Sequence, residues 1–229
     1  MKLKFDGEMK RRIAMAFLGI IVLGFSVGLF SLAALGMDPF QVFAHGVWRL
    51  TPLTFGTFYT ILSALMLVIM FIINRKKIGF GTFINMFFLG YIADFSENLF
   101  SKLIPGRDIL TRIFMLLAAL VITCFASALY MVADMGVSVY DVLSITVSER
   151  KKVPFKVCRV ISDITCVVIG GALCFISDRD LSPDGALLVT AGVGTVITAF
   201  FMGPFIAFFS RTVAEPLRYG KRRPTQNED

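Results

Sequence analysis

The chain repeats itself, and this repeat constrains its fold more than any other feature of the sequence. Residues 12–42 align with residues 112–142 at an offset of 100. Residues 79–95 align with residues 192–208 at an offset of 113, with eight identities in seventeen positions. Internal repeats in a chain rich in apolar residues are typical of transporter folds.

The composition indicates a membrane protein. Hydrophobic residues make up 56% of the chain and charged residues 17%, and the mean hydropathy is +0.78. Crossing a hydrocarbon core of about 30 Å takes about 20 residues of helix. Six segments reach that length, so we expect an all-α polytopic membrane protein with spans near 13–37, 50–74, 78–93, 113–133, 153–177 and 185–210. The third is short and must extend to Asp94 or Glu97, and the fifth includes Lys156, Arg159 and Asp163.

Lys and Arg predict the orientation of these spans. With the N-terminus inside, 18 of the 23 Lys and Arg residues fall on the cytoplasmic side, as the positive-inside rule requires. We therefore expect a multi-pass membrane protein with both termini in the cytoplasm. The net charge of +7 therefore reflects topology. The basic residues are spread over four cytoplasmic segments rather than gathered in one patch, which argues against nucleic-acid binding.

The first apolar run is expected to stay as a span. Its length, 13–37, exceeds the roughly 7–15 apolar residues of a signal peptide, and 113–133 repeats it inside the chain. The four cysteines fall inside predicted helices and form no CxxC pair, so neither a disulfide framework nor a metal site is expected.

Each repeat has three spans, and because three is an odd number, two consecutive repeats must lie upside down relative to each other in the membrane. Such inverted repeats are related by a pseudo-two-fold axis in the membrane plane. The chain is thus one membrane domain over 1–229, with repeat one near 10–100, repeat two near 108–213 and a basic cytoplasmic tail over 214–229.

Each repeat carries a helix-start pattern after its first span. Asp38, followed by Pro39 and then Gln41, reads as an N-cap, a proline at N1 and a capping-box partner. Ser138 and Asp141 occupy the equivalent cap positions. We expect short helices near 39–49 and 139–149, lying at the membrane interface or re-entering the membrane.

These motifs carry a family resemblance. The segments 36–40, 75–82 and 136–141 resemble the YczE/YyaS/YitT group of bacterial integral membrane proteins, closest to the YczE branch, over residues 10–215. The resemblance implies a six-helix inner-membrane protein without a settled activity. It also implies a distant likeness to the substrate-binding S subunits of energy-coupling-factor importers.

Charged residues inside predicted spans are the first candidates for function. Asp163 lies about eight residues into its span, about 12 Å along the helix axis, and Arg159 precedes it by one turn. Ionisable groups at such depth usually face a cavity or a partner. The pair is either a substrate or proton site, or a structural ion pair with Arg159 reaching toward the interface.

A second set of candidates lies on the matched third spans. Asp94 ends one of them and has no acidic counterpart, so it marks either an ion or substrate site or a helix end in the headgroups. Asn85, Thr82 and Thr195 are substrate or packing residues. Glycines there allow close packing or backbone approach: Gly79, Gly81, Gly90, Gly192, Gly194 and Gly203. Pro204 is expected to kink the last span.

Three functions remain open from the sequence. The first is a small-molecule or ion transporter working by alternating access of inverted repeats. The second is a binding subunit with an energising partner, because the chain has no P-loop of its own. The third is a membrane scaffold. No catalytic motif or cofactor is predicted, so we expect no enzyme. The expected partners are the lipid bilayer, an unknown small molecule or ion, and either a second copy of the chain or an energising subunit.

Overall fold

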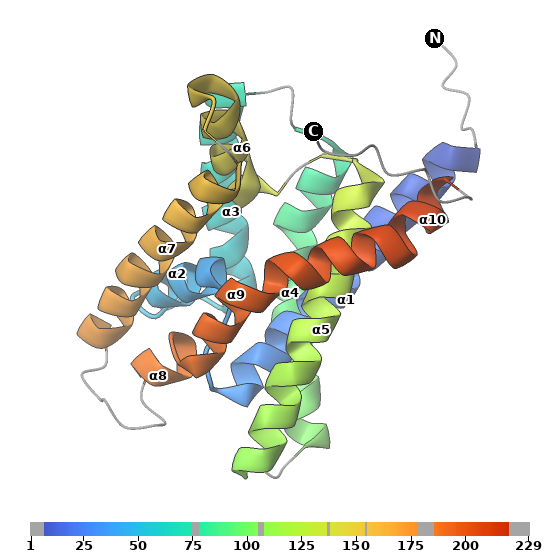
Figure 1. Cartoon of the computed structure of the whole chain (residues 1–229). Coiled ribbons are helices and arrows are strands. Elements are labelled where there is room, and N and C mark those ends of the chain that lie inside the picture. The colour runs from blue at the N-terminus through green and yellow to red at the C-terminus, as the bar shows by residue number, and fades with distance from the viewer. Residues whose placement is uncertain are drawn as a thin grey trace.

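The computed structural model describes residues 7–74, 78–104, 108–136, 138–153, 155–177 and 186–219. All regular structure in these ranges is helical, which confirms the all-α prediction (Figure 1). The helices are α1 (Gly7–Ala33), α2 (Pro39–Trp48), α3 (Phe55–Asn74), α4 (Phe80–Leu103), α5 (Ile109–Ala133), α6 (Val139–Lys151), α7 (Phe155–Ser177), α8 (Ala186–Thr190), α9 (Val193–Phe209), the π-helix η2 (Ser210–Ala214) and α10 (Glu215–Tyr219).

Among the described residues, five helical segments are long and apolar enough to cross a membrane. They are Gly7–Ala33, Phe55–Ile72, Ile109–Ala133, Val157–Ser177 and Leu187–Tyr219. The predicted third span, α4, is not among them, because Asn85, Asp94 and Glu97 lower its hydropathy. It is nevertheless 24 residues long, ends at Leu103 rather than near 93–97, and packs along α1 and α3.

The helices α1 and α5 form the central pair and run antiparallel (Figure 1). The Nε atom of Arg12, near the start of α1, donates to the carbonyl oxygen of Ala133 at the end of α5, at 2.8 Å. The Nε atom of Arg112, near the start of α5, donates to the carbonyl oxygen of Ala33 at the end of α1, at 2.9 Å. Each arginine thus supplies donors for carbonyls that have no partner within their own helix.

The loops after α1 and α5 have matching backbone conformations. Ala34 and Asp134 adopt left-handed φ values of 52° and 51°, and Gly36 and Gly136 have φ of 111° and 119°. The left-handed residue that closes each helix is therefore Ala34 or Asp134.

Each of these loops contacts the third span of the other repeat. The amide of Gly194 donates to the carbonyl oxygen of Leu35, and the amide of Gly81 donates to that of Met135. A Cβ at Gly36 would lie 2.7 Å from the amide nitrogen of Thr195, so the backbones touch there. The close contact depends on glycine in both the loop and the helix start.

The third-span glycines are not all alike. An added Cβ would meet a neighbouring atom at 3.1 Å or less at Gly79, Gly81, Gly90, Gly192 and Gly194. Gly203 departs from this pattern, because nothing lies within 4 Å of its added Cβ. Backbone approach therefore gives no reason for glycine at position 203.

The short helix α2 is packed inside the protein. Asp38 caps it by accepting from the amides of Phe40 and Gln41, at 3.2 and 3.3 Å. The side-chain oxygen of Gln41 has no hydrogen-bond partner among the described residues, so the capping box is only half formed. Seven of its ten residues are buried, unlike those of a helix lying flat on a surface.

The helices α2 and α7 touch through two glycines. A Cβ at Gly46 would lie 2.5 Å from the carbonyl oxygen of Gly170, and one at Gly170 would lie 2.4 Å from that of Val42. The helices α3 and α7 begin at Phe55 and Phe155, so the offset of 100 extends to them. The position equivalent to Gly170 in repeat one is then Met70, which packs against Val142 of α6. The first short helix can therefore lie closer to its partner helix than the second.

The last span is the least regular. It is divided into α8 and α9, and Pro204 lies inside α9. The π-helix η2 follows six residues after the proline. A proline removes a helical hydrogen bond and a π-turn inserts an extra residue, so both interrupt the regular α-helical bonding of this segment.

Candidate functional site

Arg159 and Asp163 of α7 form a compact cluster with Tyr140 at the start of α6. The Nε atom of Arg159 lies 3.2 Å from Oδ1 of Asp163, which is one helical turn further along. The hydroxyl of Tyr140 donates a hydrogen bond to the same carboxylate oxygen. The guanidinium carbon of Arg159 lies 4.6 Å from the centre of the Tyr140 ring, a cation–π contact.

The starts of the two short helices meet at this cluster. The ring of Phe40 stacks on that of Tyr140 with centroids 4.8 Å apart, and these residues are equivalent at the offset of 100. Tyr59 of α3 packs edge-on against Phe40. The N-cap Asp38 lies within electrostatic range of both Arg159 and Asp163. Residues from both repeats therefore converge on one place.

The cluster is reachable and carries an acidic excess. The side chains of Arg159 and Asp163 are 29% and 21% exposed. Among the side chains that the structure describes there, the ionised carboxylates of Asp38 and Asp163 face one guanidinium, that of Arg159. In low-dielectric surroundings such an imbalance favours a bound cation or a proton. Among the described residues, no group of three His, Cys, Asp or Glu side chains is arranged to hold a metal ion.

The other predicted residues make hydrogen bonds at helix starts and loops, or are buried between helices. Oδ2 of Asp94 accepts from the amide of Gly56 at 2.7 Å and so caps α3. Oγ1 of Thr195 accepts from the amide of Met37 at 3.1 Å, at the loop that leads to α2. Oγ1 of Thr82 accepts from the amide of Gly79 at the start of α4. Asn85 is buried in α4.

Two cap residues complete the predicted set. Ser138 accepts from the amide of Tyr140 at 3.4 Å and caps α6. The side chain of Asp141 lies outside the described part of the structure. Sequence reasoning did not select Tyr140 as a site residue. The available signal was an aromatic residue at both 40 and 140, each two residues after a cap.

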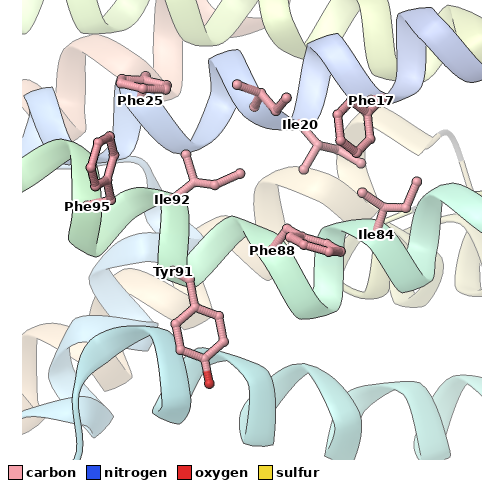
Figure 2. Close-up of a pocket in the computed structure, with 9 residues that line it drawn as sticks. Phe17, Ile20, Phe25, Ile84, Phe88, Tyr91, Ile92 and Phe95 are labelled. Carbon is pink, nitrogen blue, oxygen red and sulfur yellow. The ribbon is translucent and has the colours of Figure 1, made fainter.

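A separate hollow lies between α1 and α4. It has a volume of about 340 Å³ and an almost wholly apolar lining (Figure 2). Phe17 and Phe25 contribute from α1, and Phe88, Tyr91 and Phe95 from α4. None of the residues that line it is charged, which separates it in chemistry from the cluster around Asp163.

Comparison with known proteins places this helical membrane protein in a family. Residues 10–211 match the family described as "Family of unknown function (DUF6198)", and the chain belongs to it. An uncharacterised protein of Haemophilus influenzae is 24% identical over 205 residues, which cover 89% of this chain and 85% of that protein. The "Uncharacterized membrane protein YczE" of Bacillus subtilis is 24% identical over 224 residues, covering 95% and 94%. No solved structure matches. The predicted resemblance to the YczE branch is confirmed.

Proposed function

We propose that this protein is a transporter of a small molecule or ion, built from two inverted three-helix repeats with six spans including α4. The observation that carries the proposal is the set of reciprocal contacts between equivalent residues. Arg12 and Arg112 each bond to the end of the other's helix, and Gly81 and Gly194 each bond to the other repeat's loop. A pseudo-two-fold axis in the membrane plane accounts for these pairs together.

The site at the short-helix starts is where the cargo binds in this proposal. Inverted-repeat transporters hold their cargo near the middle of the membrane, at interrupted helices between the repeats. The burial of α2 supports a re-entrant helix rather than an interfacial one. Phe40 and Asp38 come from repeat one, and Tyr140, Arg159 and Asp163 come from repeat two. Relative motion of the repeats would expose this shared site to each side in turn.

The proposal includes the placement of the protein. It lies in the bacterial inner membrane with both termini in the cytoplasm, as the distribution of Lys and Arg favours. Its apolar exposed side chains, among them Phe71, Ile72 and Phe200, face lipid. Transport requires no chemical step, and the chain acts as a carrier rather than an enzyme.

Flux through vesicles tests the proposal. Proteoliposomes that contain only this chain are screened for uptake of radiolabelled metabolites and ions, with wild type and Asp163→Asn compared. Asp108→Asn is the matched control, because Asp108 is an exposed cap of α5 and asparagine caps equally well. We expect flux that Asp163→Asn lowers at least about tenfold and the control preserves, since a lost buried charge contact is worth more than about 1.4 kcal/mol. Flux unaffected by Asp163→Asn would contradict the assignment.

A further inference from the structure

The side chain of Arg159 has the contacts that a bound organic cation would have. Its guanidinium lies over the Tyr140 ring at 4.6 Å, and its Nε atom pairs with Asp163 at 3.2 Å. An aromatic face and a carboxylate are together the groups that bind guanidinium and ammonium ligands. Both groups come from outside the turn of α7 that carries Arg159, so they form a receptor for its charged end.

We propose that the cargo site is a cation site whose resident cation is Arg159, and that the cargo is a small organic cation of the guanidinium or ammonium class that displaces it. This inference rests on the proposed transport function and names the chemical class of its cargo. Arg159 acts as a tethered counter-cation that fills the site between cargo molecules.

The receptor is built to keep its shape when the guanidinium leaves. The Tyr140 hydroxyl donates to Oδ1 of Asp163 from another helix, so the carboxylate is held by a second contact. Tyr140 is itself buried and stacks on Phe40. The aromatic face and the carboxylate therefore keep their positions whether or not Arg159 occupies them.

Arg159 is placed so that it can move away. It begins the second turn of α7, its side chain is 29% exposed, and its long stem has several freely rotating bonds. An arginine near a helix end can reach toward the membrane surface when its inner partner is taken. Asp163 is one turn deeper in the same helix and has a short side chain, so it stays.

Charge balance gives the displacement a reason. With Arg159 in place, the described part of the site has one positive group and the two carboxylates of Asp38 and Asp163. A cationic cargo entering as Arg159 leaves preserves this balance. An anionic cargo would add a third negative charge to a low-dielectric site, which is costly.

Removing the tethered cation should create a binding site for a free one. Purified full-length protein is heated with and without methylguanidinium chloride, with potassium chloride at equal concentration as the ionic-strength control. Arg159→Ala should melt about 3 °C higher when methylguanidinium is about ten times its Kd, while wild type should need at least about tenfold more ligand. The double variant with Asp163→Asn should lose the response, and Tyr140→Phe should keep most of it.

Arg49→Ala removes an exposed arginine and should behave as wild type. Should Arg159→Ala fail to fold, Arg159→Gln retains the stem without the charge and takes its place. An equal response of the wild type and the Arg159 variant, or a response that survives Asp163→Asn, or one that potassium reproduces, would overturn the proposal. Binding without flux would leave the cation site standing and remove the transport function. Flux without a response to methylguanidinium would support the transport function and remove the cation site.

Discussion

At the scale of single residues, the packing of α2 depends on the absence of a side chain at two positions. Gly46 and Gly170 bring the backbones of α2 and α7 into direct contact. The repeat does not predict these two glycines, because the other half has Thr146 and Met70 at the corresponding positions. Only the three-dimensional arrangement shows that α7 needs glycine against the short helix α2, where α3 has methionine against the short helix α6.

Gly170→Ala should therefore destabilise the protein. Its Cβ would lie 2.4 Å from a backbone oxygen that cannot rotate away, so α2 must shift. We expect a loss of about 1–3 kcal/mol in the free energy of unfolding. Gly171→Ala is the matched control, because its Cβ would meet Leu187 at an ordinary 3.5 Å. Thermal or denaturant unfolding of both variants measures the difference, and equal stability of the two would contradict the account.

At the scale of helices, the caps decide where each element starts. Asp94 of α4 caps α3 from outside, by accepting from the amide of Gly56. Carboxylates at helix starts satisfy unpaired amides and interact favourably with the helix dipole. This contact explains why the polar end of α4 continues past Asp94 instead of ending there.

Asp94→Ala should weaken the start of α3. We expect a loss of about 0.5–2 kcal/mol in unfolding free energy, with flux retained in the assay for transport. Asn98→Ala, an exposed change one turn later, should cost less than about 0.5 kcal/mol. If Asp94→Ala abolished flux while the protein remained stable, Asp94 would be a residue of the binding site rather than only a cap of α3.

Much of the element scale was accessible from the sequence. The repeat offsets, the helical class and the two short helices were predictable, because caps and apolar runs are local signals. The charged pair in α7 was predictable from its depth. The end of α4 was not, since the partner of Asp94 lies 38 residues away, on α3. Tyr140 was missed for a similar reason, because its role depends on a contact with another helix.

At the scale of the whole molecule, an arginine of one repeat bonds to the other repeat at each end of the α1–α5 pair. At one end, Arg12 pairs with Asp134 at 3.1 Å, and Arg218 pairs with Asp134 at 3.5 Å and with Glu8 at 3.6 Å. At the other, Arg112 bonds to the carbonyl oxygens of Ala33 and Ala34. Both ends of the pair are thus held by an arginine of the facing helix, and the ion pairs of Arg12 and Arg218 lie at the end where α1 begins.

The matching contacts of Arg12 and Arg112 predict that substitutions at these two distant arginines have similar effects. Arg12→Ala and Arg112→Ala each remove charged donors from the end of the other central helix, so each should cost about 1.5–3 kcal/mol in unfolding free energy. Arg12→Lys and Arg112→Lys should recover little of this free energy, because a lysine ammonium lacks the forked donors that reach two carbonyl oxygens. Unfolding in detergent measures all four variants. A large effect at only one arginine would show that the two contacts are not equivalent.

The central claim is that equivalent positions of the two repeats lie on opposite sides of the membrane. Single cysteines replace Lys10, Leu110, Leu50 and Arg150 in a chain whose native cysteines are removed, and a membrane-impermeant maleimide is applied to whole cells and to permeabilised cells. Positions 10 and 110 are equivalent, as are 50 and 150. The inverted arrangement predicts labelling at 110 and 50 in whole cells, and at 10 and 150 only after permeabilisation. Labelling of both members of either pair from the same side would contradict it.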